Sequence, residues 1–160
     1  MKIILMMMLF FLTACGFQPV HGKYSGSAAP LPSEVPSVEI GMISDREGQM
    51  LRNALIDRIG TDGHAPYKLM VDKLEETKKE LAITKASEAT RAQLRLKTRM
   101  ILVDRSGREV LSRDLQAMTS YNVLESEFAT RVTRNAAREN AINDLARQIE
   151  LALDLYFNRK

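Results

Sequence analysis

Hydrophobic and polar residues alternate most regularly between Arg91 and Leu102. The even positions carry residues expected in a core, namely Ala92, Leu94, Leu96, Thr98, Met100 and Leu102. The odd positions are polar and mostly basic, namely Arg91, Gln93, Arg95, Lys97 and Arg99. Residues of one parity share a face of a β-strand, so this pattern predicts a strand with one buried face and one basic face.

A hairpin is predicted to follow this strand. The sequence Asp104-Arg105-Ser106-Gly107 is typical of a turn, and a two-residue loop at Ser106-Gly107 fixes an antiparallel register. On the apolar side, this register pairs Leu102 with Leu111, Thr98 with Leu115, Leu96 with Ala117 and Ala92 with Tyr121. On the basic side, it pairs Arg99 with Asp114, Lys97 with Gln116 and Arg95 with Met118. Only one cation therefore gains a charged partner within the hairpin.

The residues before this hairpin predict a strand, a helix and a second strand. Val38, Ile40 and Met42 alternate in a short strand over residues 38–43. Ser44 and Glu47 have the spacing of a capping box, and a helix is expected over residues 45–59 with Gly60 as its stop. Residues 67–83 predict one long, irregular strand, because the parity of Tyr67, Leu69 and Val71 returns at Leu81 and Ile83 after a charged interval.

A long helix is expected to close the chain over residues 127–156. Its apolar stripe comprises Ile142, Leu145, Ile149, Leu153 and Tyr156, continued toward the start by Phe128 and Val132. Arg131, Arg134 and Arg138 lie outside that stripe. Strands flanked by amphipathic helices predict an α+β domain over residues 38–160, with two helices packed on one face of a four-stranded mixed sheet in the order β-α-β-β-β-α.

The N-terminus has the pattern of a signal peptide. Lys2 precedes an apolar run over residues 3–12, which as a helix would reach only ~15 Å, too short to cross a bilayer. Residues 1–14 are therefore predicted to be a leader that is removed. The cut region Leu12-Thr13-Ala14-Cys15 resembles the bacterial lipobox, which predicts acylation of Cys15. Residues 15–37 would then form a lipidated N-terminus and a proline-rich tether.

Composition argues against several classes of function. Cys15 is the only cysteine among the 160 residues, and lipidation would use its thiol. With His21 and His64 as the only histidines, we expect no metal site, no catalytic residues and no cofactor beyond the covalent lipid on Cys15. Removal of residues 1–14 would lower the formal net charge from +3 to +2, and this nearly neutral charge does not imply a general affinity for nucleic acid. The alternative for Cys15 is a small buried thiol beside an ordinary signal peptide.

The chain resembles the LptE family of lipopolysaccharide-assembly lipoproteins, in its alphaproteobacterial form. The resemblance is carried by the lipobox, the sequence CGFQPVHG from Cys15 to Gly22, the proline-rich tether and the order of elements. The resemblance implies a lipid-anchored protein on the periplasmic side of the outer membrane. Such proteins plug and help assemble the LptD β-barrel and bind lipopolysaccharide on its way to the outer leaflet. Gly16, which follows the cysteine, resembles the pattern that allows transport to the outer membrane.

Lipopolysaccharide presents phosphates, which favour Arg and Lys donors. The candidate residues for binding lipopolysaccharide or a partner are Lys85, Arg91, Arg95, Lys97, Arg99 and Arg131, of which Lys85 and Arg131 rest on the resemblance alone. The alternative for these cations is an ordinary solvated sheet face. The alternative function is a general periplasmic binding or scaffolding lipoprotein of the outer membrane that serves another envelope complex.

Overall fold

The computed structural model describes residues 36–81 and 90–158. Their elements are β1 (Val38–Ile40), α2 (Asp45–Ile59), β2 (Tyr67–Val71), β3 (Glu75–Leu81), β4 (Thr90–Asp104), β5 (Glu109–Val123) and α3 (Glu127–Phe157). The predicted signal peptide, Cys15, Lys85 and nearly all of the tether lie outside the described residues. Within the described ranges, no helix combines the length and the apolar character that crossing a membrane requires.

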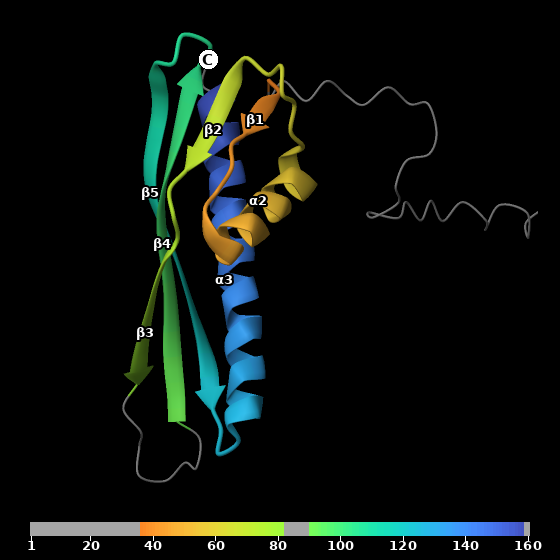
Figure 1. The fold of residues 1–160 in the computed structure, drawn as a ribbon. Coiled ribbons are helices and arrows are strands. Elements are labelled where there is room, and N and C mark those ends of the chain that lie inside the picture. The colour runs from red at the N-terminus through yellow and green to blue at the C-terminus, as the bar shows by residue number, and fades with distance from the viewer. Residues whose placement is uncertain (1–35, 82–89, 159–160) are drawn as a thin grey trace, which may run out of the picture. The chain divides into compact units, whose positions relative to one another are not determined.

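The sheet is organised around β4, its central strand. β5 pairs antiparallel with one edge of β4 over almost its whole length. β2 and β3 both pair antiparallel with the other edge, β2 with residues 100–104 and β3 with residues 91–97. The three-residue β1 adds parallel to β2. Figure 1 shows β2 and β3 following one another along the same side of β4.

Both helices lie on one face of this sheet, which confirms the predicted α+β class. α3 packs against β4 and β5 along the length of the sheet, whereas α2 packs against α3 and β1 and covers only the end that contains β1 and β2 (Figure 1). None of the described elements covers the opposite face. We call this the open face and define it as the odd-numbered residues of β4 together with the residues paired with them.

The core forms between the helices and the even-numbered residues of β4. The six even residues predicted to be buried are all at most 8% exposed. Ile142, Leu145, Ile149 and Leu153 of α3 are buried against them. Every hairpin pair predicted from the sequence occurs in the observed register. The alternation in β4 therefore determines which face of the sheet receives the helices.

The turn of the hairpin differs from the predicted two-residue loop. The Gly107 N–H donates to the Asp104 carbonyl at 2.9 Å, and the Asp104 N–H donates to the Arg108 carbonyl at 3.0 Å, which leaves a three-residue loop. Gly107 has φ 78, a left-handed conformation that favours glycine at the end of such a loop. A bulge between β4 and β5 near the turn then restores the predicted register from Leu102 onward.

The predicted single strand over residues 67–83 is wrong, because β2 and β3 are separate strands. Val71 pairs with Met100 and Glu75 pairs with Lys97, so four steps along one chain match three along β4. This extra residue reverses the parity, and Leu81 lies opposite Arg91 on the open face instead of in the core. The sheet consequently has five strands rather than four, while the fold class is unchanged. Ile83 lies outside the described residues.

Two further details at the start of the domain differ from the prediction. β1 ends at Ile40, so Met42 is 77% exposed and Ile43 takes the buried position. α2 has the predicted bounds, but the Ser44 side chain makes no capping hydrogen bond, so the capping box does not form. The Asp45 carboxylate instead binds Lys73 Nζ at 2.8 Å, and this hydrogen bond raises the pKa of Lys73.

The apolar stripe of α3 does not extend to the start of the helix as predicted. Phe128 is 76% exposed and Val132 is 52% exposed, whereas Thr130, Ala137 and Ala141 are buried there. These three small residues continue the helical face of Leu145 toward the N-terminus. The short side chains let α3 lie close to β5, where the Thr119 hydroxyl donates to the Ala137 carbonyl at 3.0 Å.

The start of α2 depends on a glycine in contact with the preceding loop. A Cβ atom at Gly48 would lie 2.7 Å from Ile43 Cγ2 and 3.0 Å from the Ile43 carbonyl carbon. Ile43 is only 1% exposed, so neither its side chain nor its backbone can move aside freely. Gly48 thus allows the loop to pack directly against the helix.

We expect Gly48→Ala to lower the free energy of unfolding. Alanine favours the helix over glycine by about 1 kcal/mol, but overpacking a core contact costs about 1–3 kcal/mol. The measurement is urea unfolding followed by circular dichroism. Asn53→Ala, at an exposed position of the same helix, is the control and should be neutral or slightly stabilising. A Gly48→Ala variant as stable as the control would contradict the close packing.

Candidate functional site

The open face gathers four of the six residues that the sequence predicted for binding. Arg91, Arg95, Lys97 and Arg99 occupy successive odd positions of β4, apart from Gln93, and all four lie opposite the helices. A strand rises about 3.3 Å per residue, so these cations extend over roughly 26 Å. They stand on a strand that is paired along both edges, which fixes their spacing.

β3 adds residues to this face that the sequence did not reveal. Its register places Glu75 opposite Lys97, Thr77 opposite Arg95 and Lys79 opposite Gln93. Lys79 is exposed and therefore joins the four cations of β4 on this face. The one-residue shift between β2 and β3 decides this placement, because without it the even-numbered residues of β3 would occupy the open face.

Two cations of the open face are bound to carboxylates. Lys68 of β2, opposite Val103, binds Glu39 Oε1 at 2.8 Å. Arg99 donates from Nε and Nη2 to the two oxygens of Asp114 at 2.7 and 3.1 Å. This hydrogen bonding lowers the pKa of Asp114 and raises that of Arg99. Lys79, Arg91, Arg95 and Lys97 form no ion pair with any described residue. The cations available to a ligand thus lie toward the end of the sheet that β3 occupies.

A pocket lies in the middle of the open face, at the junction between β2 and β3. Carboxylates and cations both line it, namely Asp72, Glu75 and Asp114 with Lys73, Lys97 and Arg99. Its mixed charge makes it a poor site for an anion. Unopposed positive charge begins beyond the pocket, at Arg95, Lys79 and Arg91. We call Lys79, Arg91, Arg95 and Lys97 the basic strip.

The other two residues predicted for binding are Arg131 and Lys85. Arg131 lies near the start of α3, on the helix side of the sheet, where its Nη2 binds Glu127 Oε1 at 3.2 Å. Its side chain is therefore not part of the open face. Lys85 lies outside the described residues.

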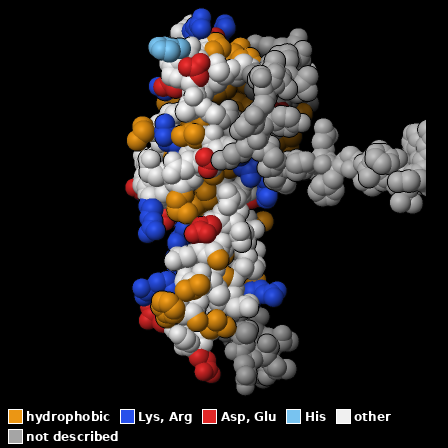
Figure 2. Space-filling view, turned by 90° about the vertical axis from the view of Figure 1, so that its right-hand side faces the viewer, with side chains coloured by type: hydrophobic (Ala, Val, Ile, Leu, Met, Phe, Trp, Pro, Cys, Tyr) orange, Lys and Arg blue, Asp and Glu red, His pale blue; other side chains and the backbone are white. Residues whose placement is uncertain are grey.

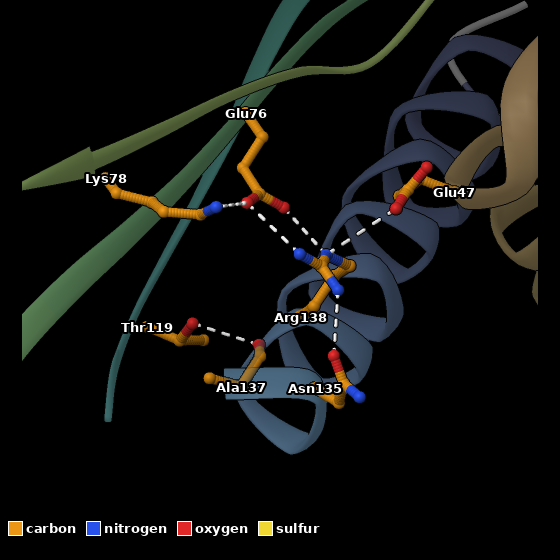
Figure 3. Close-up of polar contacts among 7 residues, drawn as sticks. All are labelled: Glu47, Glu76, Lys78, Thr119, Asn135, Ala137 and Arg138. Atoms are coloured by element: carbon orange, nitrogen blue, oxygen red, sulfur yellow. Dashed lines mark hydrogen bonds and ion pairs between the residues drawn. The ribbon is translucent and has the colours of Figure 1, made fainter. Parts of the chain in front are cut away.

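A second charged cluster lies on the helix side of β3 (Figure 3). Arg138 of α3 donates from Nε to one carboxylate oxygen of Glu76 at 2.7 Å and from Nη2 to the other at 3.2 Å. Its Nε also lies 3.7 Å from Glu47 Oε1 of α2, and its Nη1 donates to Asn135 Oδ1 at 3.0 Å. Lys78 Nζ binds Glu76 from the side of β3 at 3.1 Å. One guanidinium thus joins α2, α3 and β3.

This cluster takes the place of an apolar core beneath β3. The residues of β3 on the helix side are Glu76, Lys78 and Glu80, opposite the buried Leu96, Leu94 and Ala92 of β4. The side chains of Arg138 and Glu76 are each 20% exposed, so water screens their pairing less than that of a surface ion pair. Their hydrogen bond lowers the pKa of Glu76 and raises that of Arg138. The cluster holds in place the strand that presents Lys79 to the open face.

No group of His, Cys, Asp and Glu residues suited to a metal ion occurs in residues 36–81 and 90–158. His64 is exposed in a turn, where its backbone N–H donates to Asp62 Oδ1 at 3.0 Å.

Comparison with known proteins relates the chain to one family and one fold. The family model described as "LptE: Lipopolysaccharide-assembly" matches residues 35–153. No curated protein sequence matches significantly. The crystal structure of a lipoprotein from Caulobacter crescentus has 23% identity and a TM-score of 0.61, covering 77% of this chain and 92% of that one.

Two other lipoproteins have a similar fold. A minor lipoprotein from Acinetobacter baumannii has 23% identity and a TM-score of 0.52, covering 77% of this chain and 90% of that one. The rare lipoprotein B from Shewanella oneidensis has 10% identity and a TM-score of 0.53, covering 73% and 91%. At these identities the similarity concerns the fold alone.

We expect Glu76→Gln to reduce stability at neutral pH and to flatten its dependence on pH. Because the pKa of Glu76 lies below its ordinary value, the ionised carboxylate stabilises the fold above that ordinary value, and this stabilisation is lost as the pH falls through the folded-state pKa. Breaking such a half-buried charged pair costs about 1–3 kcal/mol. Urea unfolding between neutral and acidic pH measures both effects.

The control for this prediction is Glu80→Gln, because Glu80 is exposed on the same side of β3 and has no ion pair among the described residues. Its pH dependence should match that of the wild type. Hydrogen exchange should accelerate in β3 of the Glu76→Gln variant and remain unchanged in β5. Equal stability of both variants at every pH would show that the Arg138 cluster does not hold β3.

Proposed function

Because the chain belongs to the LptE family of lipopolysaccharide-assembly proteins, we propose that it is an outer-membrane lipoprotein that plugs and helps assemble the LptD β-barrel and binds lipopolysaccharide during its insertion into the outer leaflet. In this role the protein acts by binding rather than by catalysis. It is anchored on the periplasmic side through a lipid on Cys15, the residue that follows the lipobox. Two acyl chains there would make attachment effectively permanent.

The basic strip is the observation that carries the binding part of this proposal. Arg91 and Arg95 can each donate two parallel hydrogen bonds to a phosphate, and the two lysines add point charges beside them. All four have no ion pair among the described residues, so a ligand need not displace an internal partner. The pairing of β4 on both edges fixes the spacing of the backbone that carries Arg91, Arg95 and Lys97, which lowers the entropic cost of binding.

The helix side of the domain supports the part of the proposal that places it inside a barrel. A body lodged in a polar lumen needs a hydrophilic outer surface. Figure 2 shows Lys and Arg side chains mixed with Asp and Glu on this side, with hydrophobic side chains between them. Several cations here are paired, such as Arg58 with Glu150 at 3.0 Å and Arg147 with Asp144 at 3.0 Å. The open face differs in that the four cations of the basic strip form no ion pair among the described residues.

We expect the double variant Arg95→Ser/Lys97→Ser to bind lipopolysaccharide about tenfold more weakly, because lost charge-assisted hydrogen bonds of this kind correspond to more than ~1.4 kcal/mol. Thermal unfolding should be nearly unchanged, since neither side chain forms an ion pair among the described residues and charges at the surface contribute little to stability. The measurement is a binding titration with purified lipopolysaccharide.

The matched control is Arg46→Ser/Arg105→Ser, which removes the same charge from two exposed arginines outside the open face. Its affinity should stay close to that of the wild type. Arg131→Ser, tested separately, shows whether Arg131, which the family resemblance suggested, contributes to lipopolysaccharide binding. Equal losses in the two double variants would mean that net charge, and not the basic strip, determines binding.

The lipid anchor and the barrel partner are tested together in cells. Mass spectrometry of the native protein should find Cys15 acylated at a new N-terminus, and Cys15→Ser should release the protein from the membrane fraction. Extraction of the wild type in mild detergent should recover a much larger β-barrel in fixed ratio. A lone lipoprotein, with the barrel folded in its absence, would count against the role as plug and assembly factor.

A further inference from the structure

The outer edge of β5 is unpaired among the described residues. Asp72 lies between β2 and β3, on the edge of β4 opposite to β5, and its N–H donates to the Arg99 carbonyl at 2.9 Å. The backbone N–H and carbonyl groups of the odd-numbered residues of β4 therefore point away from β5. It follows that even-numbered residues of β5 direct theirs outward. In agreement, the outward carbonyls of Gln116 and Asn122 accept hydrogen bonds from the Gln148 amide and the Thr133 hydroxyl of α3, at 3.0 and 2.9 Å.

The edges of this sheet differ in how they discourage pairing with another chain. β1 has only three residues, and β3 has the charged sequence EETKKEL, both of which disfavour strand addition. β5 has fifteen residues and contains neither Lys nor Pro. It is thus the one described edge that offers a long backbone ladder without these protections.

Beside this edge, β5 and α3 form an apolar groove. Leu111, Arg113 and Leu115 line one side of the groove, and Leu151, Leu155 and Tyr156 line the other. Leu151 is 58% exposed and Leu155 is 50% exposed, so the groove offers apolar area that a bound segment could bury. Arg113 is the one charged residue of the groove and has no ion pair among the described residues.

We propose that the β5 edge between Leu111 and Leu115 binds an extended segment of a partner protein by strand addition. The bound segment places apolar side chains opposite Leu111 and Leu115 and a carboxylate opposite Arg113. In an antiparallel ladder these three positions are the non-hydrogen-bonded pairs, in which facing side chains approach most closely. The outward groups of Ser112 and Asp114 supply the backbone hydrogen bonds. This inference does not rest on the proposed function.

Charge argues against a second copy of this chain as the occupant. To cover both apolar grooves, two antiparallel β5 strands must align residues 111–115 of each copy with those of the other. That register places Arg113 directly opposite Arg113 of the second copy, and like charges in facing positions are destabilising. A partner segment with an acidic residue between two apolar ones removes this conflict.

The test uses the full-length protein and short peptides of the pattern apolar-Thr-Glu-Thr-apolar, in which the apolar residues vary among Val, Ile, Leu and Phe. The control set has Lys in place of Glu. We expect at least about a tenfold preference for the Glu set, and Arg113→Glu should reverse it. Equal binding of the two sets, or a preference that Arg113→Glu leaves unchanged, would overturn the proposal.

A second variant tests the backbone ladder. Ser112→Pro removes an outward N–H that β4 does not use, and proline is tolerated at edge positions that face away from the ladder. The variant should lose peptide binding while its thermal unfolding stays close to that of Ser112→Ala, which retains the N–H and should bind as the wild type does. Binding by a folded Ser112→Pro variant equal to that of Ser112→Ala would contradict strand addition. If the proline variant unfolds, the Arg113→Glu result decides.

Hydrogen exchange and sedimentation distinguish the other possible occupants. The amides of Ser112 and Asp114 should exchange rapidly in the free monomer and slowly with a Glu peptide bound. Protection of these amides in the free monomer would show that a segment of this chain covers the edge. A dimer that Ser112→Pro dissociates would show a second copy there. Either result would overturn the proposal, whether or not the protein binds lipopolysaccharide.

Discussion

The alternation of side chains along β4 is the constraint on which the rest of the structure depends. Its even residues are buried under the two helices, and its odd residues carry the cations of the open face. Shifting the register of this strand by one residue would bury arginines and expose leucines. The cost of burying unpaired charges makes such a shift prohibitive, so the same pattern that builds the core also fixes the position of the basic strip.

β3 depends on a different interaction from the rest of the sheet. It contributes almost no apolar area, and the half-buried pairing of Arg138 with Glu76 connects it to α3. Glu47 of α2 lies near the same guanidinium, so the ionic contacts of Arg138 connect both helices to one edge strand. The position of Lys79 on the open face therefore depends on charges at the opposite side of the sheet. Conditions that neutralise Glu76 would loosen β3 before they disturb the core.

The two sides of β5 suit two different kinds of contact. Its pairing with β4 completes the open face, where unpaired cations match phosphate chemistry. Its outer edge and the adjoining groove present backbone groups and exposed leucines, which match an extended polypeptide. A ligand on the open face and a protein segment on the β5 edge would not compete for the same groups, because the two surfaces share a strand without sharing side chains.

The sequence alone determined the elements with strong periodicity. The bounds of α2, the hairpin register, the buried face of β4 and the positions of Arg91, Arg95, Lys97 and Arg99 follow from local patterns, because burial imposes a period of two on strands and about 3.6 on helices. The family resemblance, carried by the N-terminal motif and the order of elements, agrees with the family model that matches residues 35–153. Residues near the ends of elements were predicted less well, as Met42, Phe128 and Val132 show.

Only the tertiary structure decided how β2 and β3 divide and which of their residues reach the open face. Between Val71 and Glu75, only the buried Leu74 at an even position marks the change of parity, and the charged residues that follow carry no information on burial. The Arg138 cluster joins residues distant in sequence. The outer edge of β5 is unpaired because β2 and β3 pair with the other edge of β4. These features arise from pairing between segments, and no local periodicity records them.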